Sequence, residues 1–330
     1  MKKILFLRFS SIGDIVLTFP VVRAVSEQIP NIEIHYATKN KFVELLSGCP
    51  CIFRIHSFTK TTSEIRTELL KENFECIIDL HNNLRSVSLS AYLNIKTYRY
   101  PKLNLQKWLL VNFKWNILRE SHVVDRYFES VKKLHVKNPR QNNTFHIPPE
   151  AEIRLEDWGV RVKSFIAIAL GAQFQTKQFP FDKLTRLIDK LRDPIVLLGG
   201  ENEVKLGHRI IDQFPNRKIV NFSGELSILQ SAFVVKHAAI LVTNDSGLMH
   251  IASCFDTPIH LIWGNTVRAF GMFSYRPEHP KLTTDYEVNL PCRPCSKIGF
   301  SSCPKGHHLC MMNIDENKIA SGIAKDLSDK

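Results

Sequence analysis

Asp14 stands in a loop where a carboxylate could act on a bound substrate. It follows the apolar residues 4–7, and Gly13 just before it lets the backbone turn closely. Such a carboxylate either caps the helix that follows or acts as a general base, taking a proton from an attacking hydroxyl. We favour the general base because three further polar loops accompany it. The loop lacks the glycine pattern of dinucleotide-binding folds, which disfavours a nicotinamide enzyme.

Lys177 and Glu203 stand in two later loops that also follow apolar runs. Lys177 lies in a Thr-Lys-Gln-Phe-Pro segment just before a helix, so its ammonium could neutralise a diphosphate while free backbone N–H groups bind the phosphate oxygens. Glu203 follows an apolar run and two glycines, and an acid there could accept hydrogen bonds from ribose hydroxyls. The alternatives are an exposed lysine without a role and an acid favoured in the first turn of a helix.

The segment Val-Thr-Asn-Asp-Ser-Gly-Leu-Met-His at residues 242–250 gives the strongest signal. An apolar strand turns there through small polar residues into a helix, whose free N–H groups can bind an anion. Asp245 itself would repel phosphate, so we expect it to cap the helix or to bind sugar hydroxyls. His250 is either a packed helix residue or a ligand contact. The four loops together indicate a nucleotide-sugar site.

Short apolar runs alternate with longer amphipathic ones, and these elements must position the loops. In the first half the pattern predicts strands at 4–7, 32–37 and 76–80, and helices at 16–28, 41–46, 65–72, 106–118 and 123–134. In the second half it predicts strands at 165–170, 195–198, 240–243 and 259–262, and helices at 181–191, 203–214, 227–237, 248–254 and 314–327. This alternation indicates α/β units with parallel sheets, whose ligands bind beyond the carboxyl ends of the strands.

The chain is long enough for two domains. It has 330 residues, and the polar stretch 138–149, which contains three prolines, looks like a linker. We therefore expect a Rossmann-like acceptor-binding domain at 1–150 and a Rossmann-like nucleotide-sugar-binding domain at 151–312. The last segment, 313–330, is expected to form a helix that packs across both domains.

Four motifs, taken in order, resemble the signature set of glycosyltransferase family 9, the lipopolysaccharide heptosyltransferases. They are Ser-x-Gly-Asp at 11–14, Asp-Leu-His at 79–81, Thr-Lys-x-aromatic-Pro at 176–180 and Asp-Ser-Gly-Leu-Met-His at 245–250. The resemblance implies the α/β fold called GT-B, in which two Rossmann-like, doubly wound parallel-sheet domains face a central cleft. It also implies an inverting enzyme that moves heptose from ADP-heptose onto a lipopolysaccharide core or lipid A-linked acceptor.

The resemblance also assigns roles to residues. Asp14 would be the catalytic base. The residues expected to bind the donor are Thr176, Lys177, Glu203, Asp245, Ser246, Gly247, Leu248 and His250. The residues expected to bind the acceptor are Ser11, Gly13, His81, Arg85 and Arg126. The family usually has tryptophan where this chain has Phe179.

The positive charge of the chain is concentrated in residues 85–140. This segment holds twelve Lys or Arg against three acids, which is nine of the net twelve positive charges of the chain. Such a patch is typical of a surface for phosphorylated lipid, membrane headgroups or nucleic acid, and the alternative is a solvated helical face. Given the sugar-transfer motifs, we expect an anionic lipid-linked saccharide as partner, contact with the inner membrane surface, and no nucleic acid.

Two features bear on metals. The chain has no Asp-x-Asp, so we expect no metal at the diphosphate and no cofactor for catalysis; Lys177 and helix dipoles would offset the leaving-group charge. A Cys-x-x-Cys motif at Cys292 and Cys295, followed by Cys303 and Cys310, fits a structural zinc, although the second pair is spaced more widely than usual. Reduced, buried thiols are the alternative.

The N-terminal apolar run is too short for a signal peptide, and no run reaches the roughly 18 apolar residues of a membrane span. We therefore expect a cytoplasmic protein, at most peripheral to the inner membrane. Two rival functions stay open. A GT-B-like nucleotide-sugar epimerase would turn over the donor without any acceptor. A non-catalytic polyanion-binding protein would need none of the four loops.

Overall fold

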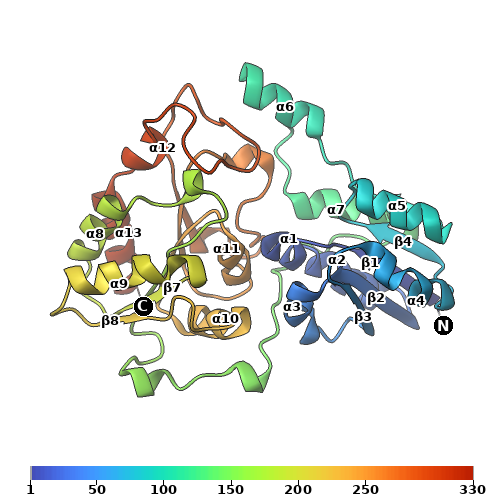
Figure 1. Ribbon diagram of the computed structural model, residues 1–330, viewed down its shortest axis with the longest axis horizontal. Helices are drawn as coiled ribbons and strands as arrows, with labels where there is room; N and C mark the ends of the chain where they lie inside the picture. The colour runs from blue at the N-terminus through green and yellow to red at the C-terminus, as the bar shows by residue number, and fades with distance from the viewer. Residues whose placement is uncertain (1, 330) are drawn as a thin grey trace. The chain divides into compact units, whose positions relative to one another are not determined.

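The computed structural model describes residues 2–329, which divide by their contacts into two compact units (Figure 1). Unit 1 holds the described residues up to Leu103 together with Glu120–His146. Unit 2 holds Asn104–Arg119 and the described residues from Ile147 onward. The change of unit at 146 lies inside the polar stretch 138–149. The domain bounds expected from the sequence place all of residues 1–150 in one domain. They remain a prediction.

Unit 1 is built on a parallel sheet with the strand order β3-β2-β1-β4-β5 in its described part. The strands are β1 (Lys2–Leu7), β2 (Ile32–Lys39), β3 (Arg54–Phe58), β4 (Cys76–Asp79) and β5 (Thr97–Arg99). The α-helices are α1 (Ile12–Val16), α2 (Phe19–Gln28), α3 (Val43–Ser47), α4 (Arg66–Lys71), α5 (Leu84–Leu93) and α7 (Val123–Val131). Short 3-10 helices are η1 (Asn40–Phe42), η2 (Thr62–Ile65) and η3 (Lys132–Leu134).

Unit 2 is also built on a parallel sheet, with the order β11-β10-β9-β6-β7-β8. The strands are β6 (Ile166–Ala169), β7 (Ile195–Leu198), β8 (Ile219–Asn221), β9 (Ile240–Asn244), β10 (Ile259–Ile262) and β11 (Thr283–Tyr286). The α-helices are α6 (Asn104–Phe113), α8 (Phe181–Lys190), α9 (Val204–Gln213), α10 (Ile228–His237), α11 (Gly247–Ala252), α12 (Leu309–Met312) and α13 (Glu316–Ser328). The 3-10 helices are η4 (Pro149–Ala151), η5 (Leu155–Trp158), η6 (Gln175–Lys177), η7 (Glu201–Glu203), η8 (Arg268–Phe270) and η9 (Pro280–Leu282).

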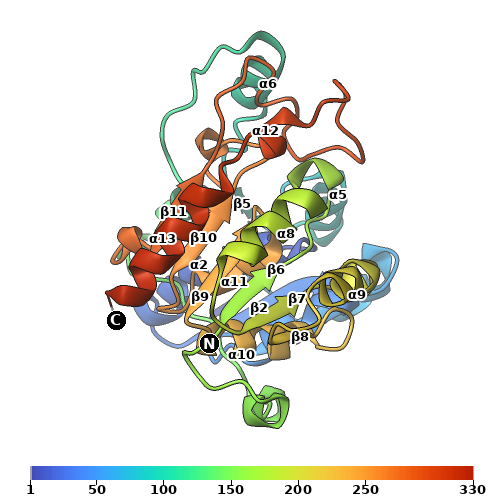
Figure 2. The same ribbon diagram turned by 90° about the vertical axis from the view of Figure 1, so that its left-hand side faces the viewer.

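The central strands of unit 2 are buried on both faces because helices cover each side of the sheet. Along β6, Ile166 and Ile168 pack into a cluster with α8 and α13, whereas Ala167 and Ala169 face a second cluster with α10 and α11. Figure 2 shows α8 and α13 side by side on their face of the sheet. Successive side chains of a strand point to opposite faces, so a continuous apolar run is what such a strand requires.

Most predicted elements are confirmed, and two helices differ for physical reasons. The helix expected at 16–28 is α2, which begins at Phe19, while Val16 ends the separate short helix α1; Pro20 stands in the first turn of α2, where its missing N–H costs nothing. The helix expected at 106–118 ends at Phe113, because Lys114 adopts a left-handed backbone conformation with φ of 61°. The helix expected at 314–327 is α13, and its packing across both domains stays a prediction.

Candidate active site

Each sheet reverses its strand order at one point, and the polar loops predicted from the sequence lie there, except the loop of Glu203, which follows β7. In unit 1 the reversal falls between β1 and β4, which lead into the loops of Asp14 and His81. In unit 2 it falls between β6 and β9, which lead into the loops of Lys177 and Asp245. Open parallel sheets bind ligands beyond the carboxyl ends of the strands at such a point. Each unit therefore offers one candidate site.

Asp14 is held in place by the buried side chain of Arg8, the first residue after β1. Nη2 of Arg8 lies 2.7 Å from Oδ1 of Asp14. The other oxygen, Oδ2, accepts a hydrogen bond of 2.9 Å from the hydroxyl of Ser11, the N-cap residue of α1, three positions before Asp14. The Asp14 side chain is nevertheless 24% exposed. The carboxylate is therefore fixed in direction but still reachable by a ligand.

The other donors of Arg8 are engaged within unit 1. Nε donates to the carbonyl of Ser10 at 2.7 Å, and Nη1 donates to the carbonyl of Leu80 and to the hydroxyl of Tyr127 at 3.1 Å. Burial lowers the pKa of Arg8, but the charges of Asp14 and the neighbouring tyrosines outweigh burial and leave the pKa above its ordinary value. Sequence reasoning missed Arg8. The signal that could have revealed it is an arginine directly after a buried apolar strand.

His81 lies in the loop after β4, and both of its ring nitrogens are buried. The residue is 8% exposed and packs against Phe9, with ring centroids 4.8 Å apart. Neither ring nitrogen has a hydrogen-bond partner within residues 2–329. Burial and the positive charges of Arg8, Lys102 and Arg85 lower the pKa of His81 to about 3. The ring is therefore neutral at physiological pH and can exchange hydrogen bonds with a hydroxyl.

Asp79, the last residue of β4, fixes the backbone that carries His81. Its Oδ1 accepts hydrogen bonds from the N–H groups of His81 at 3.1 Å and Asn82 at 2.7 Å. Its Oδ2 accepts from the hydroxyl of Ser86 at 2.9 Å and from Nε of Arg99 at 3.1 Å. Because both carboxylate oxygens are engaged and the residue is fully buried, Asp79 shapes the loop rather than meeting a ligand.

The other residues predicted for the acceptor lie in three elements of unit 1. Gly13 is buried in α1, directly before Asp14 in the same helix, so Asp14 stands in a first helical turn and not in the expected loop. Arg85 is exposed in the first turn of α5 and is close enough to His81 to lower the pKa of that ring. Arg126 is buried in α7, its Nη1 donates to the carbonyl of Lys102 at 3.4 Å, and burial lowers the pKa of Arg126. Arg85 is thus open to solvent, whereas Arg126 is enclosed.

In unit 2, Lys177 and Asp245 form an ion pair at the reversal point of the sheet. Nζ of Lys177 donates to Oδ2 of Asp245 at 2.6 Å, and the hydroxyl of Thr266 donates to the same oxygen at 2.8 Å. The N-cap position of α11 belongs to Ser246, so the first of the two roles expected for Asp245, capping this helix, is wrong, and the second, binding sugar hydroxyls, stays a prediction. Asp245 instead holds Lys177. Thr266 follows β10, and no motif in the sequence pointed to it.

Thr176 anchors the turn that carries Lys177. It is buried, its hydroxyl donates to Oδ1 of Asn265 at 3.0 Å, and it accepts from the N–H of Phe300 at 2.9 Å. The backbone packs equally closely, since a Cβ on Gly264 would lie 2.3 Å from the carbonyl oxygen of Thr176. Only glycine fits there. Thr176 therefore determines where the backbone of Lys177 lies.

Glu203 lies against the loops that follow β6 and β7. Its Oε2 accepts a hydrogen bond from the N–H of Gly200 at 2.9 Å. A Cβ on Gly171 would lie 2.7 Å from the carboxyl carbon of Glu203, so the glycine after β6 makes room for this acid. The carboxylate is partly exposed beyond the carboxyl ends of both strands. It can accept hydrogen bonds from hydroxyls there.

The remaining residues predicted for the donor lie at the start of α11. Ser246, Gly247 and Leu248 are partly exposed, whereas His250 is buried in the same helix. Phe179, the position where the family usually has tryptophan, is buried in the cluster that also contains Leu184 of α8. Its ring therefore packs into the core of unit 2.

The four C-terminal cysteines are free thiols. Burial, with a smaller contribution from Cys292 and Cys303, raises the pKa of the Cys295 thiol. Within residues 2–329, the only group of potential metal ligands whose ligand atoms all lie within 4.8 Å of one another is elsewhere, at His35, His56 and Glu72. The thiols do not converge to that distance, and zinc at the cysteines stays a prediction.

Known proteins share both the sequence and the fold. A lipopolysaccharide heptosyltransferase 1 from Campylobacter coli is 24% identical over 288 residues, which covers 80% of this chain and 84% of that protein. The structure of a family 9 glycosyl transferase from Veillonella parvula has a TM-score of 0.78 at 17% identity, covering 100% of this chain and 98% of that one. The E. coli ADP-heptose lps heptosyltransferase II gives 0.74 at 18% identity, covering 100% and 99%.

These neighbours confirm the fold class predicted from the sequence, the GT-B type with two parallel-sheet α/β domains. The family model described as "Glycosyltransferase family 9 (heptosyltransferase)" matches residues 63–299. That match includes the predicted donor-binding residues and leaves Asp14 outside. Because the model covers well over half of the chain, the protein belongs to glycosyltransferase family 9.

Proposed function

We propose that this glycosyltransferase is an inverting, metal-independent enzyme that moves heptose from ADP-heptose to a lipopolysaccharide-core acceptor. The observation that carries the proposal is the carboxylate of Asp14, which Arg8 and Ser11 fix at the reversal point of unit 1 while leaving it reachable. A carboxylate that is fixed in direction and partly exposed to solvent suits a general base.

In the proposed reaction, Asp14 takes the proton of an acceptor hydroxyl as that oxygen attacks the anomeric carbon of the donor sugar. The new carbon–oxygen bond forms on the face opposite the diphosphate, and the bond from the anomeric carbon to the phosphate oxygen breaks. The proton ends on the Asp14 carboxyl, and the nucleoside diphosphate leaves with the electron pair. The configuration at the anomeric carbon is therefore inverted.

Lys177 supplies the charge that the leaving diphosphate needs. Its ammonium is paired with Asp245, itself held by Thr266, so a bound diphosphate competes with Asp245 for the same cation. Glu203, beside Gly171, accepts hydrogen bonds from the ribose hydroxyls. The chain has no Asp-x-Asp to hold a divalent metal at the diphosphate, so this lysine and backbone N–H groups carry the electrostatic stabilisation.

The names of the relatives support heptose and ADP as the donor. They are heptosyltransferases of lipopolysaccharide synthesis, and the name of the E. coli enzyme with the same fold specifies ADP-heptose. On the acceptor side, neutral His81 donates a hydrogen bond to a sugar hydroxyl or accepts one from it. Exposed Arg85 pairs with an acceptor phosphate.

The segment around α6 supports contact with the cytoplasmic face of the inner membrane. Its large apolar side chains are 52–65% exposed, at Leu105, Trp108, Phe113, Trp115 and Ile117. They stand in the basic segment 85–140, and aromatic and basic side chains together favour an anionic lipid surface. Within residues 2–329, no helix is long and apolar enough to cross a membrane. The proposed contact is therefore peripheral.

Sedimentation with vesicles tests this contact. The double variant Trp108→Ala/Trp115→Ala should bind vesicles containing anionic lipid several-fold more weakly than the unchanged protein, because two exposed aromatic side chains no longer insert. The matched control is Trp158→Ala, which removes an equally exposed tryptophan from η5 in another part of unit 2. Equal vesicle binding by all three proteins contradicts the membrane proposal.

The assay for the reaction is ADP release from ADP-heptose, measured with and without a lipopolysaccharide-core acceptor, with mass spectrometry of the product. Transfer predicts ADP release that depends on the acceptor, and a product heavier by one heptose. Donor turnover without acceptor would instead indicate an epimerase. Salt-dependent polyanion binding without affinity for ADP would indicate a binding protein. The zinc predicted at Cys292, Cys295, Cys303 and Cys310 is measured by the metal content of the same preparation.

A further inference from the structure

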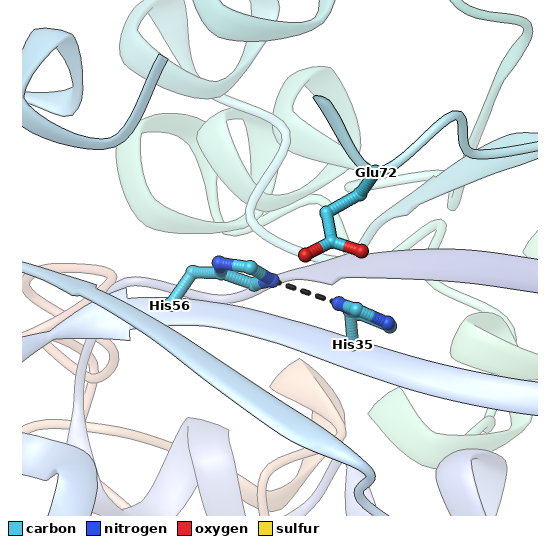
Figure 3. Close-up of side chains that lie close together, drawn as sticks. All are labelled: His35, His56 and Glu72. Atoms are coloured by element: carbon cyan, nitrogen blue, oxygen red, sulfur yellow. Dashed lines mark hydrogen bonds between the residues drawn. The ribbon is translucent and has the colours of Figure 1, made fainter. Parts of the chain in front are cut away.

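Two histidines and a glutamate of unit 1 form a buried cluster that the proposed transfer reaction does not use. His35 of β2 and His56 of β3 point from the same face of the sheet, and Glu72 follows the C-terminus of α4 (Figure 3). The rings are 0% and 1% exposed. One ligand atom from each of the three residues lies within 4.8 Å of the other two. Figure 3 shows the Glu72 carboxylate beside both rings.

The hydrogen bonds of the two rings leave one nitrogen without a partner. Nδ1 of His56 lies 2.7 Å from Oε1 of Glu68 and so carries a proton that it donates to this carboxylate. Nε2 of His56 is then an acceptor, and Nδ1 of His35 donates to it at 2.8 Å. Nε2 of His35 is left as a bare lone pair. It has no hydrogen-bond partner within residues 2–329, and neither has the buried Oε2 of Glu33 3.8 Å away.

This arrangement lacks a positive charge. In the hydrogen-bond pattern above each ring carries a single proton, so both rings are neutral. The charged side chains around them are three carboxylates, Glu33, Glu68 and Glu72, and two cations, Lys3 and Arg54. The ion pairs of Lys3 and Arg54 with Glu72, both at 2.7 Å, leave the group one negative charge in excess. A buried orphan nitrogen and an excess negative charge are both relieved by a bound cation.

A metal in place of the proton between the rings gives the outer nitrogen of each ring a carboxylate to face, although it shares Glu72 with Lys3 and Arg54. With His35 Nδ1 and His56 Nε2 as ligands, the outer nitrogens of both rings become N–H donors, and each faces a carboxylate: Glu68 for His56 and Glu33 for His35. A carboxylate behind a ligating imidazole is the usual support of a histidine metal ligand, because it fixes the ring and raises its basicity. Glu72 supplies an oxygen from the third side.

We propose that His35, His56 and Glu72 form a binding site for a divalent transition-metal ion of the Zn²⁺ class. Two imidazoles and one carboxylate are a donor set that Zn²⁺ accepts in tetrahedral geometry. Glu72 is 13% exposed, so the ion enters from its side and completes its coordination with solvent. The two nitrogens, 2.8 Å apart, must separate by a few tenths of an ångström, because ligands of a tetrahedral ion about 2.0 Å away lie about 3.3 Å from one another.

The ion would act as a clip on one edge of unit 1. It joins β2, the edge strand β3 and the end of α4, which are three separate segments of the sequence. A ligand that binds the folded state and not the unfolded state stabilises the fold by a free energy that grows with the logarithm of its concentration over its dissociation constant. The metal site would therefore raise the thermal stability of unit 1 and take no part in sugar transfer.

The test is metal titration of the full-length protein after removal of metal with a chelator. Zn²⁺ is titrated by calorimetry, and the melting temperature is followed in parallel. Removal of either imidazole should reduce the number of bound ions by one and abolish the zinc-dependent rise in melting temperature, and His56→Gln is the principal variant. Glu68→Gln removes only the carboxylate behind His56, so the affinity should fall about 10–100-fold with the stoichiometry unchanged. His208→Gln, an exposed histidine of α9, is the matched control.

Cobalt distinguishes this site from the C-terminal cysteines. Co²⁺ bound by thiolates absorbs strongly in the near ultraviolet through sulfur-to-metal charge transfer, whereas Co²⁺ bound by imidazole and carboxylate does not. The absorption lost in His56→Gln should lack the sulfur band. Glu72→Gln at the rim of the site gives a second variant, should His56→Gln not fold. Unchanged stoichiometry and affinity in a folded variant of either residue overturn the proposal.

Discussion

The two reversal points of the protein hold their functional charges in opposite ways. In unit 1, all three side-chain nitrogens of the buried Arg8 are engaged, one of them with Asp14, whose side chain is 24% exposed. In unit 2, by contrast, the acid holds the cation: Asp245 binds Lys177 through a single contact. The difference indicates a fixed base in one unit and an exchangeable cation in the other. A base must keep its direction throughout the reaction, whereas a cation that meets a diphosphate must be able to change partner.

Asp14→Asn tests the fixed base and should have the largest effect. The amide keeps the shape of the side chain but cannot take a proton, so kcat should fall about 10²–10⁴-fold, the usual contribution of a general base. Donor binding should stay nearly unchanged, because Asp14 belongs to the reversal point of unit 1. Steady-state transfer and ADP calorimetry measure the two quantities. Full activity of the variant removes Asp14 from the chemistry.

Lys177→Ala tests the exchangeable cation. Loss of one preorganised charge at a leaving group should lower kcat about 10²–10³-fold and also weaken ADP binding. Lys177→Arg is the matched control, since it keeps the charge and should recover much of the affinity. An unchanged dissociation constant for ADP in Lys177→Ala removes this residue from the phosphate site.

Arg8→Lys separates charge from direction in unit 1. Lysine keeps the positive charge but has one nitrogen where Arg8 uses three, so it cannot hold Asp14 and the carbonyls of Ser10 and Leu80 together. A base displaced by about 1 Å costs roughly 10²-fold in rate. The prediction is a fall in kcat of that order with ADP affinity unchanged. If Arg8 only filled space, kcat would follow the melting temperature across several Arg8 variants.

The sequence predicted the interior of both sheets and missed their edges. The strands without a prediction are β3, β5, β8 and β11, and each is an edge strand. A central strand is buried on both faces and therefore has a continuous apolar run, as in β7, whose bounds were predicted correctly. An edge strand such as β5, with two partly exposed residues and one exposed residue, has no such run. Sheet pairing defines it, and pairing depends on residues far away in the sequence.

The candidate site divides in the same way. Residues in loops after buried strands, such as Lys177 and Asp245, were found from their sequence neighbours. Two side chains that hold site residues were missed. Thr266, to which no motif pointed, binds Asp245, and Arg8, whose position directly after a buried strand was the available signal, binds Asp14. The pairing of Lys177 with Asp245 also corrected the expected capping role of this acid. Sequence motifs therefore locate a site, and the packing of the fold determines which charged side chains pair with one another.

His81 sharpens the comparison through its pH dependence. An unfolded histidine has a pKa near 6.5, whereas in the folded protein burial and the cations around it lower the pKa of His81 to about 3. As the pH falls below about 6.5, His81 therefore becomes protonated in the unfolded chain but stays neutral in the folded protein. The free energy of unfolding should lose about 1.4 kcal/mol per pH unit from this residue alone, down to about pH 3.

His81→Gln removes that loss. Between pH 6 and pH 4, the free energy of unfolding of the variant should therefore decline less steeply than that of the unchanged protein, and the two slopes should differ by about 1.4 kcal/mol per pH unit, the value for one proton. Other buried histidines, such as His35, contribute equally to both proteins and cancel in the difference. Urea unfolding at several pH values measures the slopes, with the exposed His208→Gln as control. Parallel slopes would mean that His81 is protonated in the folded protein. The ring beside Asp14 would then be a second cation like Arg8, and unit 1 would no longer hold its base with one buried positive charge.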